Sequence, residues 1–373
     1  MKSKDKESMK ILITGNMGYV GPILVRQLRD TYPEGTLIGL DMGYFGNCLS
    51  STGILPECRV NHQYFADVRS FPEELLSGVD AIVYLAALSN DPLGLTFEKA
   101  TLDINYRACV RLATKAKEAG VKSFVFASSC SVYGYAEDGF RTEDSPVNPI
   151  TAYAKSKVWT ERDIAPLADV RFKVTCLRFA TACGMSDRLR LDLVLNDFVA
   201  GAVTSKKISI LSDGKPWRPL IHVKDMARAI DWAVQRDPQQ GGSFLSVNVG
   251  SDQWNYQVKD LAEVVAQVIP GVEVCINKNA QPDKRSYRVA FEKFNRLAPG
   301  YTPRVDLIGA IAELRDGLSA IDFKDENFRY SNFIRLNVLR GLTKKGLLTD
   351  DLGWAFGASP QKNSFIPQSV PLS

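Results

Sequence analysis

Three side chains in the middle of the chain have the types and the spacing of an acid–base centre. Tyr153 and Lys157 lie four residues apart in a helical pattern, so both point to the same side of the expected helix. A free phenol has a pKa of about 10, and a nearby ammonium favours the phenolate and lowers that pKa. Ser129, at the end of an apolar run, can hold the oxygen whose proton is removed. The three residues therefore predict a tyrosine base that deprotonates an alcohol.

A glycine-rich turn near the N-terminus predicts a bound dinucleotide beside that base. Gly15, Gly18 and Gly21 directly follow an apolar run and open a helical pattern. Glycines at a strand-to-helix turn allow a tight bend and let a pyrophosphate approach the first N–H groups of the helix. Asp41 ends the next apolar run, where a carboxylate accepts hydrogen bonds from a ribose diol and repels a 2′-phosphate. We therefore expect a dinucleotide site that prefers NAD to NADP, rather than a glycine-rich turn without a ligand.

The elements that must position these residues alternate between short apolar runs and helical patterns. We expect strands at residues 10–14, 36–40, 61–65, 79–86, 122–128 and 172–179. We expect helices between them at residues 19–31, 71–77, 95–119 and 151–168. This alternation predicts an α/β fold with a doubly wound parallel sheet of the Rossmann type, whose ligands bind at the carboxyl ends of the strands.

After about Cys183 the pattern becomes mixed and predicts a second, smaller α/β lobe that is interleaved with the first domain. The further helices are expected at residues 193–203, 223–235 and 257–269, and the further strands at residues 208–211 and 243–249. We assign the NAD-binding domain to residues 1–182 and 218–252, and the substrate-binding lobe to residues 183–217 and 253–356. Residues 357–373 are rich in Ser, Pro, Gln and Asn, and we expect a poorly ordered tail.

Composition excludes several other classes of protein. The 373 residues are 45% hydrophobic and 24% charged, and a net charge of +4 is too small to indicate a nucleic-acid partner. Because no run of about 18 apolar residues occurs, we expect no membrane span, and because the polar first ten residues have no apolar core, we expect no signal peptide. The seven cysteines form no C-x-x-C pair and none lies beside a histidine, so we expect no metal site, no disulfides and a cytoplasmic location. His62 and His222 are each isolated, and we interpret both as structural.

These motifs together resemble the extended short-chain dehydrogenases/reductases, in the branch of NAD-dependent nucleotide-sugar epimerases and dehydratases. The resemblance covers roughly residues 9–310. Besides the glycine turn, the serine-rich strand end and the tyrosine–lysine pair, it rests on Asp67-Val68, Leu85-Ala86-Ala87, Asn105, Leu177-Arg178-Phe179 and Arg218-Pro219-Leu220-Ile221-His222-Val223. The set is specific for the superfamily and much less so for the reaction.

The resemblance implies a set of cofactor contacts. The glycines hold the pyrophosphate of NAD, Asp41 binds the adenosine ribose, and Asp67 with Val68 binds the adenine. Residues 85–87 line the nicotinamide. The full implied set is Gly15, Gly18, Tyr19, Val20, Gly21, Asp41, Asp67, Val68, Leu85, Ala86, Ala87, Asn105, Tyr153 and Lys157.

The resemblance also implies the catalytic and substrate groups. Tyr153 is the base, Lys157 lowers its pKa and binds the nicotinamide ribose, and Ser129 is the catalytic hydroxyl. The implied partner is a nucleotide-diphosphate sugar, whose diphosphate is held by Asn196 and Arg218, with Arg285 as a further phosphate contact. Cys130 lies in the sugar pocket.

Several positions depart from the family pattern. Cys130 and Ser131 stand where the 4,6-dehydratases carry Asp-Glu, so we do not expect dehydration. The glutamate that the nucleotide-sugar decarboxylases carry there is missing too. The usual sugar-pocket asparagine is replaced around Thr181-Ala182-Cys183. The late Arg-Pro-Gly-Asp segment is present only as Gln281-Pro282-Asp283-Lys284-Arg285. Cys130 and Cys183 could act as acid–base groups, but a free cysteine is more often a small core residue.

The leading hypothesis is therefore an NAD-dependent oxidoreductase that oxidises a nucleotide-linked sugar at C4 and acts as an epimerase. One alternative is a nucleotide-sugar 4-dehydrogenase or ketoreductase with net cofactor turnover. Another is a non-catalytic dinucleotide sensor, which has no need of the three catalytic side chains. The family further implies a homodimer through helices 95–119 and 151–168. The apolar positions expected on that face are Leu112, Ala116, Val158 and Trp159.

Overall fold

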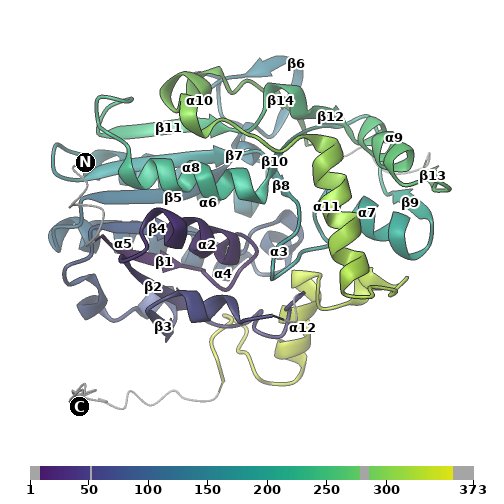
Figure 1. The fold of residues 1–373 in the computed structure, drawn as a ribbon. Helices are drawn as coiled ribbons and strands as arrows, with labels where there is room; N and C mark the ends of the chain where they lie inside the picture. Colours follow the sequence, from purple (N-terminus) through teal and green to yellow (C-terminus); the bar gives the residue numbers. More distant parts are fainter. Residues whose placement is uncertain (1–8, 51–52, 278–284, 356–373) are drawn as a thin grey trace.

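The predicted doubly wound sheet is confirmed by the computed structural model, which describes residues 9–50, 53–277 and 285–355. Seven parallel strands lie in the order β3-β2-β1-β4-β5-β7-β11 (Figure 1). Their bounds are β1 Lys10–Thr14, β2 Thr36–Asp41, β3 His62–Phe65, β4 Ala81–Tyr84, β5 Ser123–Ser129, β7 Lys173–Phe179 and β11 Phe244–Val249. The central strands are apolar on both faces because helices cover both faces of the sheet.

Two hydrophobic cores form, one on each face of the sheet. Helices α2 (Gly21–Thr31) and α8 (Val223–Gln235) pack over one face with Ile11 and Ile13 of β1. Helix α5 (Ala108–Glu118) packs over the other face with Leu12. Alternate residues of one strand thus enter opposite cores, as the pleat of a strand requires.

The predicted helix 95–119 is divided in the structure. It becomes α3 (Asp91–Thr96), α4 (Glu98–Leu102), a π-helical turn (Asp103–Arg107) and α5. Asn90 ends the preceding loop by accepting a hydrogen bond from the N–H of Leu93, so the helical segment starts earlier than hydrophobic periodicity suggested. The helix expected at residues 71–77 is only a 3₁₀ turn, Glu73–Leu76. Helix α6 (Ala152–Ile164) matches its prediction closely.

Smaller sheets and helices lie along the top and the right of the view in Figure 1, with the last helix below them. The small sheets are β12-β10-β8, β13-β9 and β14-β6. Their strands are β6 Tyr135–Arg141, β8 Thr181–Cys183, β9 Lys207–Ile210, β10 Trp217–His222, β12 Asn255–Gln257, β13 Glu273–Ile276 and β14 Ser286–Val289. The helices are α7 Val194–Thr204, α9 Val258–Val268, α10 Glu292–Leu297, α11 Leu307–Ala320 and α12 Arg335–Lys344.

The C-terminal part of the described chain does not stay with these smaller elements. Leu339 of α12 is buried in the same core as α5, together with Leu348 and Leu352. Helix α12 also packs against α3. Residues 335–355, which the sequence placed in the substrate lobe, therefore lie against the parallel sheet domain. The predicted tail 357–373 lies outside the described residues.

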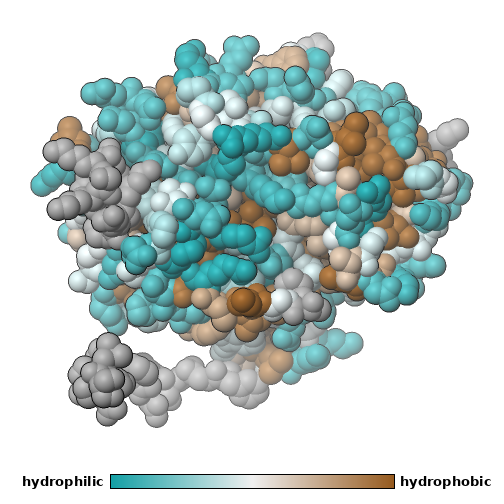
Figure 2. Space-filling view, viewed as in Figure 1, coloured by the Kyte–Doolittle hydropathy of each residue, from teal (hydrophilic) through white to brown (hydrophobic). Residues whose placement is uncertain are grey.

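Two of the four positions expected on a dimer face are wrong. Leu112 and Ala116 are fully buried in the core of their own chain, because α5 turns its apolar stripe toward the sheet. Val158 and Trp159 of α6 remain partly exposed. On the face shown in Figure 2, hydrophilic side chains are interspersed with small apolar patches. None of the helices in the described part of the chain has the length and apolar character needed to cross a membrane.

Candidate active site

A cleft of about 410 Å³ opens at the carboxyl ends of the parallel strands, where the topology predicted it. Most of the predicted residues line this single cleft. They are Gly15, Gly18, Tyr19, Val20, Asp41, Asp67, Val68, Leu85, Ala86, Ala87, Ser129, Tyr153, Lys157, Arg218 and Arg285. The structure thus brings the glycine turn, the tyrosine–lysine pair and the two arginines to one site.

The glycine turn is held by close backbone contacts. Gly15 has a φ of +74°, and a Cβ atom there would lie 2.6 Å from the backbone nitrogen of Ala86. Gly21 does not line the cleft, but a Cβ on it would lie 1.9 Å from the carbonyl oxygen of Asn16. Only glycine fits these two positions, so the turn after β1 can approach residues 85–86 beyond β4, and the start of α2 can pack on Asn16.

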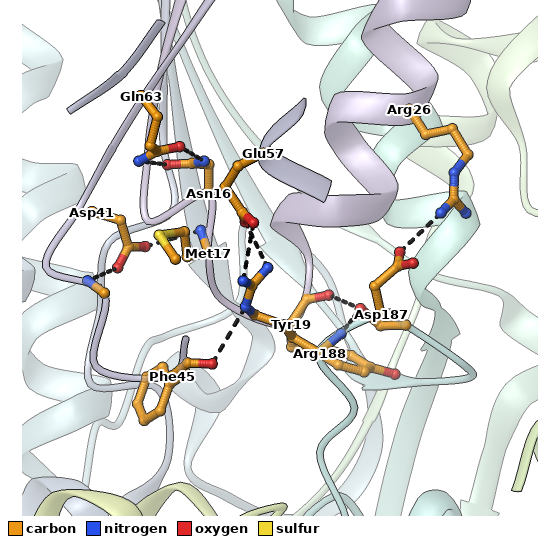
Figure 3. A network of polar contacts seen from close by, with 12 residues as sticks. Asn16, Met17, Tyr19, Arg26, Asp41, Phe45, Glu57, Gln63, Asp187 and Arg188 are labelled. Carbon is orange, nitrogen blue, oxygen red and sulfur yellow. Dashed lines mark hydrogen bonds and ion pairs between the residues drawn. The ribbon is translucent and has the colours of Figure 1, made fainter. Parts of the chain in front are cut away.

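Asp41 ties the glycine turn to the end of β2, as Figure 3 shows. One carboxylate oxygen accepts a hydrogen bond from the N–H of Met17 at 3.0 Å, and the other accepts from the N–H of Gly43 at 2.8 Å. Burial raises the pKa of Asp41, and these two N–H groups oppose the rise. Asp67, also in the cleft, pairs with Arg69 at 2.7 Å.

Tyr153 and Lys157 lie on one face of α6, as predicted. The ammonium of Lys157 donates a hydrogen bond to the carbonyl of Ala127 at 2.7 Å and lies 5.4 Å from the centre of the Tyr153 ring. Burial lowers the pKa of Lys157 to about 8. Burial raises the pKa of Tyr153 to about 12, and a hydrogen bond with Ser129 opposes that rise. In the free protein, desolvation of the phenol therefore outweighs any pull from Lys157, and Tyr153 is neutral at neutral pH.

A buried ion pair supports the strand ends beneath the catalytic pair. Glu161 of α6 accepts hydrogen bonds from Arg178 of β7, the shortest at 2.7 Å, and from the hydroxyl of Ser128. Arg178 also donates to the hydroxyl of Tyr133. The arginine of the Leu-Arg-Phe segment thus has a supporting position, which fixes β5 and β7 against the helix that carries Tyr153.

Three other predicted residues support the site from outside the cleft lining. Asn105 exchanges hydrogen bonds with both backbone groups of Leu88, at 2.9 and 3.0 Å, and so shapes the loop after β4. Asn196 accepts from the N–H of Gly184 and donates to the carbonyl of Arg190 at 2.9 Å. The thiol of Cys130 is buried against the carbonyl of Arg178. Residue type alone could not show that these polar groups point inward.

At the other end of the cleft, Arg285 forms an ion pair with Asp91, and Arg218 donates to the carbonyl of Arg285. Thr151 donates to the same aspartate at 2.6 Å. Tyr287 lies beside these arginines in the lining. The remaining predicted positions of that segment, Gln281-Pro282-Asp283-Lys284, lie outside the described residues.

The sequence reasoning missed Arg190, Asp192 and Arg335, which also line the cleft. Arg190 forms a bidentate pair with Asp192, both contacts at 2.9 Å, and donates to Ser89 at 2.8 Å. The alternation Arg188-Leu189-Arg190-Leu191-Asp192 just before α7 was an available signal, because arginines rarely alternate with leucines in a buried loop unless they are paired.

The histidines and cysteines are not part of the cleft lining. His222 is buried at the start of α8, where its Nδ1 accepts from the N–H of Lys224 at 3.2 Å and its Nε2 lies 3.2 Å from Glu313. His62 is exposed at the edge strand. All seven cysteines are free, and burial raises the pKa of Cys130 and of Cys183. Within the described ranges, no cluster of His, Cys, Asp and Glu could hold a metal ion.

Comparison with known proteins places this arrangement among sugar-nucleotide enzymes. Residues 11–250 match the model described as "NAD dependent epimerase/dehydratase family". The chain is 30% identical over 256 residues (65% of the chain, 77% of the relative) to the "Uncharacterized UDP-glucose epimerase YtcB" of Bacillus subtilis. It is 26% identical over 315 residues (81% and 92%) to a dTDP-glucose 4,6-dehydratase of Streptomyces griseus. "MoeE5 in complex with UDP-glucuronic acid and NAD" superposes with a TM-score of 0.71 at 25% identity, covering 83% of this chain and 99% of that one.

The lowered pKa of Lys157 predicts a pH-dependent effect on stability. Between a folded pKa of about 8 and an unfolded value of about 10.4, the unfolded chain binds the proton and the folded chain does not. The burial penalty is thus complete below pH 8 and fades as the pH rises. We expect the free energy of unfolding of the wild type, relative to Lys157→Met, to increase by on the order of 2 kcal/mol between pH 7 and pH 10.

The measurement is urea denaturation of the cofactor-free proteins across that pH range. Lys155→Met is the control, because Lys155 lies on the same helix but is exposed. A difference for Lys157→Met that stays flat with pH would show that no buried ammonium titrates at this position.

Proposed function

Because the chain belongs to the NAD dependent epimerase/dehydratase family, we propose that it is an epimerase that inverts C4 of a nucleotide-linked hexose. The observation that carries the proposal is the joint presence of Ser129, Tyr153 and Lys157 in one buried cleft with the glycine turn. A dinucleotide sensor would need the glycine turn and the acidic strand end, but not a buried tyrosine–lysine pair beside a serine hydroxyl.

The roles of the residues follow from their positions. NAD, the cofactor of the family, supplies the hydride acceptor. Tyr153 takes the proton of the C4 hydroxyl, and Ser129 holds the same oxygen. Lys157 contributes positive charge next to the phenol and is anchored by Ala127. Tyr153 would later return the proton to the same oxygen, and bound NAD would supply the redox chemistry at C4.

Dehydration is disfavoured by the carboxylates of the cleft. Elimination of water next to C4 needs an acid and a base besides Tyr153. The 4,6-dehydratases use two adjacent acidic residues for this, and Cys130 and Ser131 occupy those two positions in this chain. The described lining contains four carboxylates, each already engaged. They are Asp41 with two backbone N–H groups, Asp67 with Arg69, Asp91 with Arg285 and Asp192 with Arg190. These engaged carboxylates favour epimerisation over dehydration. Because a relative is a 4,6-dehydratase, the assay must also look for a dehydrated product.

The first test is product analysis. Purified protein with NAD is incubated with UDP-glucose, UDP-galactose, UDP-N-acetylglucosamine and dTDP-glucose, and products are separated by chromatography and identified by NMR. We expect interconversion of one pair of C4 epimers without net formation of reduced nicotinamide. Stoichiometric reduction of NAD would indicate a 4-dehydrogenase, and a 4-keto-6-deoxy product would refute the proposal. If NAD binds but none of these sugars gives a product, the remaining hypotheses are a dinucleotide sensor and an enzyme for another sugar nucleotide.

The second test is the order of effects among catalytic variants. Tyr153→Phe keeps the packing of the ring and removes the proton acceptor, so turnover should fall at least about 100-fold with NAD affinity nearly unchanged. Lys157→Met should reduce both turnover and NAD affinity. Ser129→Ala should cost less than either, because water can partly replace a hydroxyl that orients the substrate. Turnover is measured with saturating NAD, and binding by calorimetry. Near-normal turnover of Tyr153→Phe would remove the phenol from the mechanism.

We also propose a homodimer through α6 and the π-helical turn before α5, with a contact face that differs from the one expected from sequence. Tyr106 and Trp159 pack edge to face, with ring centres 5.7 Å apart, and both are partly exposed beside Val158. Such a self-complementary aromatic face suits a two-fold contact. Light scattering at micromolar concentration should give a dimer for the wild type and a monomer for Trp159→Lys. Val170→Lys, at a fully exposed position elsewhere, is the control. A monomeric wild type would contradict the proposal.

A further inference from the structure

One arginine of the cleft forms no direct ion pair with a carboxylate of the described residues. Arg335, the first residue of α12, is 2% exposed and lines the cleft. Its Nη2 donates to the carbonyl of Arg188 at 2.8 Å, and its guanidinium lies 4.5 Å from the centre of the Phe45 ring. Its Nη1 is buried and has no hydrogen-bond partner. A buried guanidinium with an unused donor is costly unless an anion completes it.

The neighbouring carboxylates do not supply that anion. Glu57 is committed to Arg188, with contacts of 2.6 and 3.1 Å (Figure 3). Asp192 is committed to Arg190 through its bidentate pair. Neither carboxylate therefore forms an ion pair with Arg335 itself. Burial lowers the pKa of Arg335 to about 10. Arg190 and Arg188 add to that effect, whereas Cys48 and Asp192 oppose it. The group is still charged at neutral pH.

The position of Arg335 along the cleft selects the kind of anion. Phe45, on which it lies, follows β2 in the same loop as Asp41 and Tyr44, all part of the lining. Arg190 lies close enough to Tyr19 of the glycine turn and to Tyr153 to affect the pKa of both phenols. Arg190 is thus near the glycine turn, and Arg335 lies beside the segment that follows β2. Arg218 and Arg285, the groups expected to hold the sugar diphosphate, lie together with Tyr287 and Asp91 instead.

We propose that Arg335, assisted by Arg190, binds the pyrophosphate of the dinucleotide together with the glycine turn. A planar guanidinium with a free N–H suits phosphate oxygens, and the N–H groups at the start of α2 would bind the same group. The C-terminal helix therefore completes the cofactor site. This inference rests on the cofactor cleft and is independent of which sugar reaction follows.

Further contacts of the C-terminal segment support this role. The hydroxyl of Tyr44 donates to the carbonyl of Leu352, and the indole of Trp354 donates to the carbonyl of Met42 at 2.8 Å. Arg69, the partner of Asp67, donates to the carbonyl of Asp351 at 2.7 Å. The chain after α12 thus touches the same loops that form the adenosine end of the cleft. Cofactor binding and docking of residues 335–355 are expected to stabilise each other.

The test compares binding of three probes to matched variants by calorimetry. Adenosine lacks phosphate, ADP carries the diphosphate, and NAD is the full cofactor. For Arg335→Met we expect roughly tenfold or greater loss of affinity for ADP and NAD, with adenosine unchanged. Arg335→Lys should recover part of the lost affinity, because lysine keeps the positive charge but lacks the planar guanidinium that can donate two hydrogen bonds to a phosphate. Arg340→Met is the control, since Arg340 is an exposed arginine on the same helix.

Other outcomes would overturn the proposal. Equal losses for adenosine and ADP would mean that Arg335 only packs against the adenosine pocket. UDP-glucose is titrated as a further probe, and a loss of its affinity with NAD binding unaffected would make the sugar diphosphate the anion. Thermal unfolding without ligand checks the fold, and removal of an unpaired cation should leave Arg335→Met at least as stable as the wild type. If Arg335→Met fails to fold, Arg335→Lys still tests the proposal. An NAD affinity of Arg335→Lys equal to that of the wild type would contradict a bidentate phosphate contact.

Discussion

The close approach of the glycine turn to the neighbouring strand ends is the constraint on which the rest of the cleft depends. Gly15 and Gly21 leave no room for a side chain against Ala86 and Asn16. Gly39 in the middle of β2 is equally crowded, since a Cβ there would lie 2.5 Å from the amide of Asn16. These contacts bring the start of α2, the end of β4 and the acidic end of β2 within reach of one ligand. The other elements of the site are arranged around these closely packed segments.

Desolvation governs the chemistry of the free cleft more than pairwise attraction does. It raises the pKa of Tyr153 and lowers that of Lys157, so both groups are pushed toward their neutral forms. The charges that persist are held by partners, as in the pairs Glu161–Arg178 and Arg190–Asp192. For Tyr153 to act as the proposed base, positive charge must be added nearby so that the phenolate forms at neutral pH. Under the proposed function, the oxidised cofactor in the cleft would supply that charge.

The sequence predicted the parallel sheet well because its signals are local. Apolar runs, glycine spacing and helical periodicity located the strands within one or two residues and brought most of the site to one edge. The divided helix before α5 was missed, since Asn90 and the π-helical turn override a continuous apolar pattern. The pairing of β6 with β14 joins segments about 150 residues apart and has no local signal. Asn196 and Cys130 have chemically suitable side chains, but packing turned them away from the cleft.

The family match ends at residue 250, yet the cleft is completed by residues beyond it. Arg285, Tyr287 and Arg335 all come from the last third of the chain and all line the cleft. The glycine turn, Tyr153 and Lys157 lie within the matched range. Arg285, which pairs with Asp91, and Arg335, which is buried beside Phe45, come from beyond it. Because this part of the lining is built by long-range contacts, similarity to epimerases or dehydratases does not by itself assign the reaction.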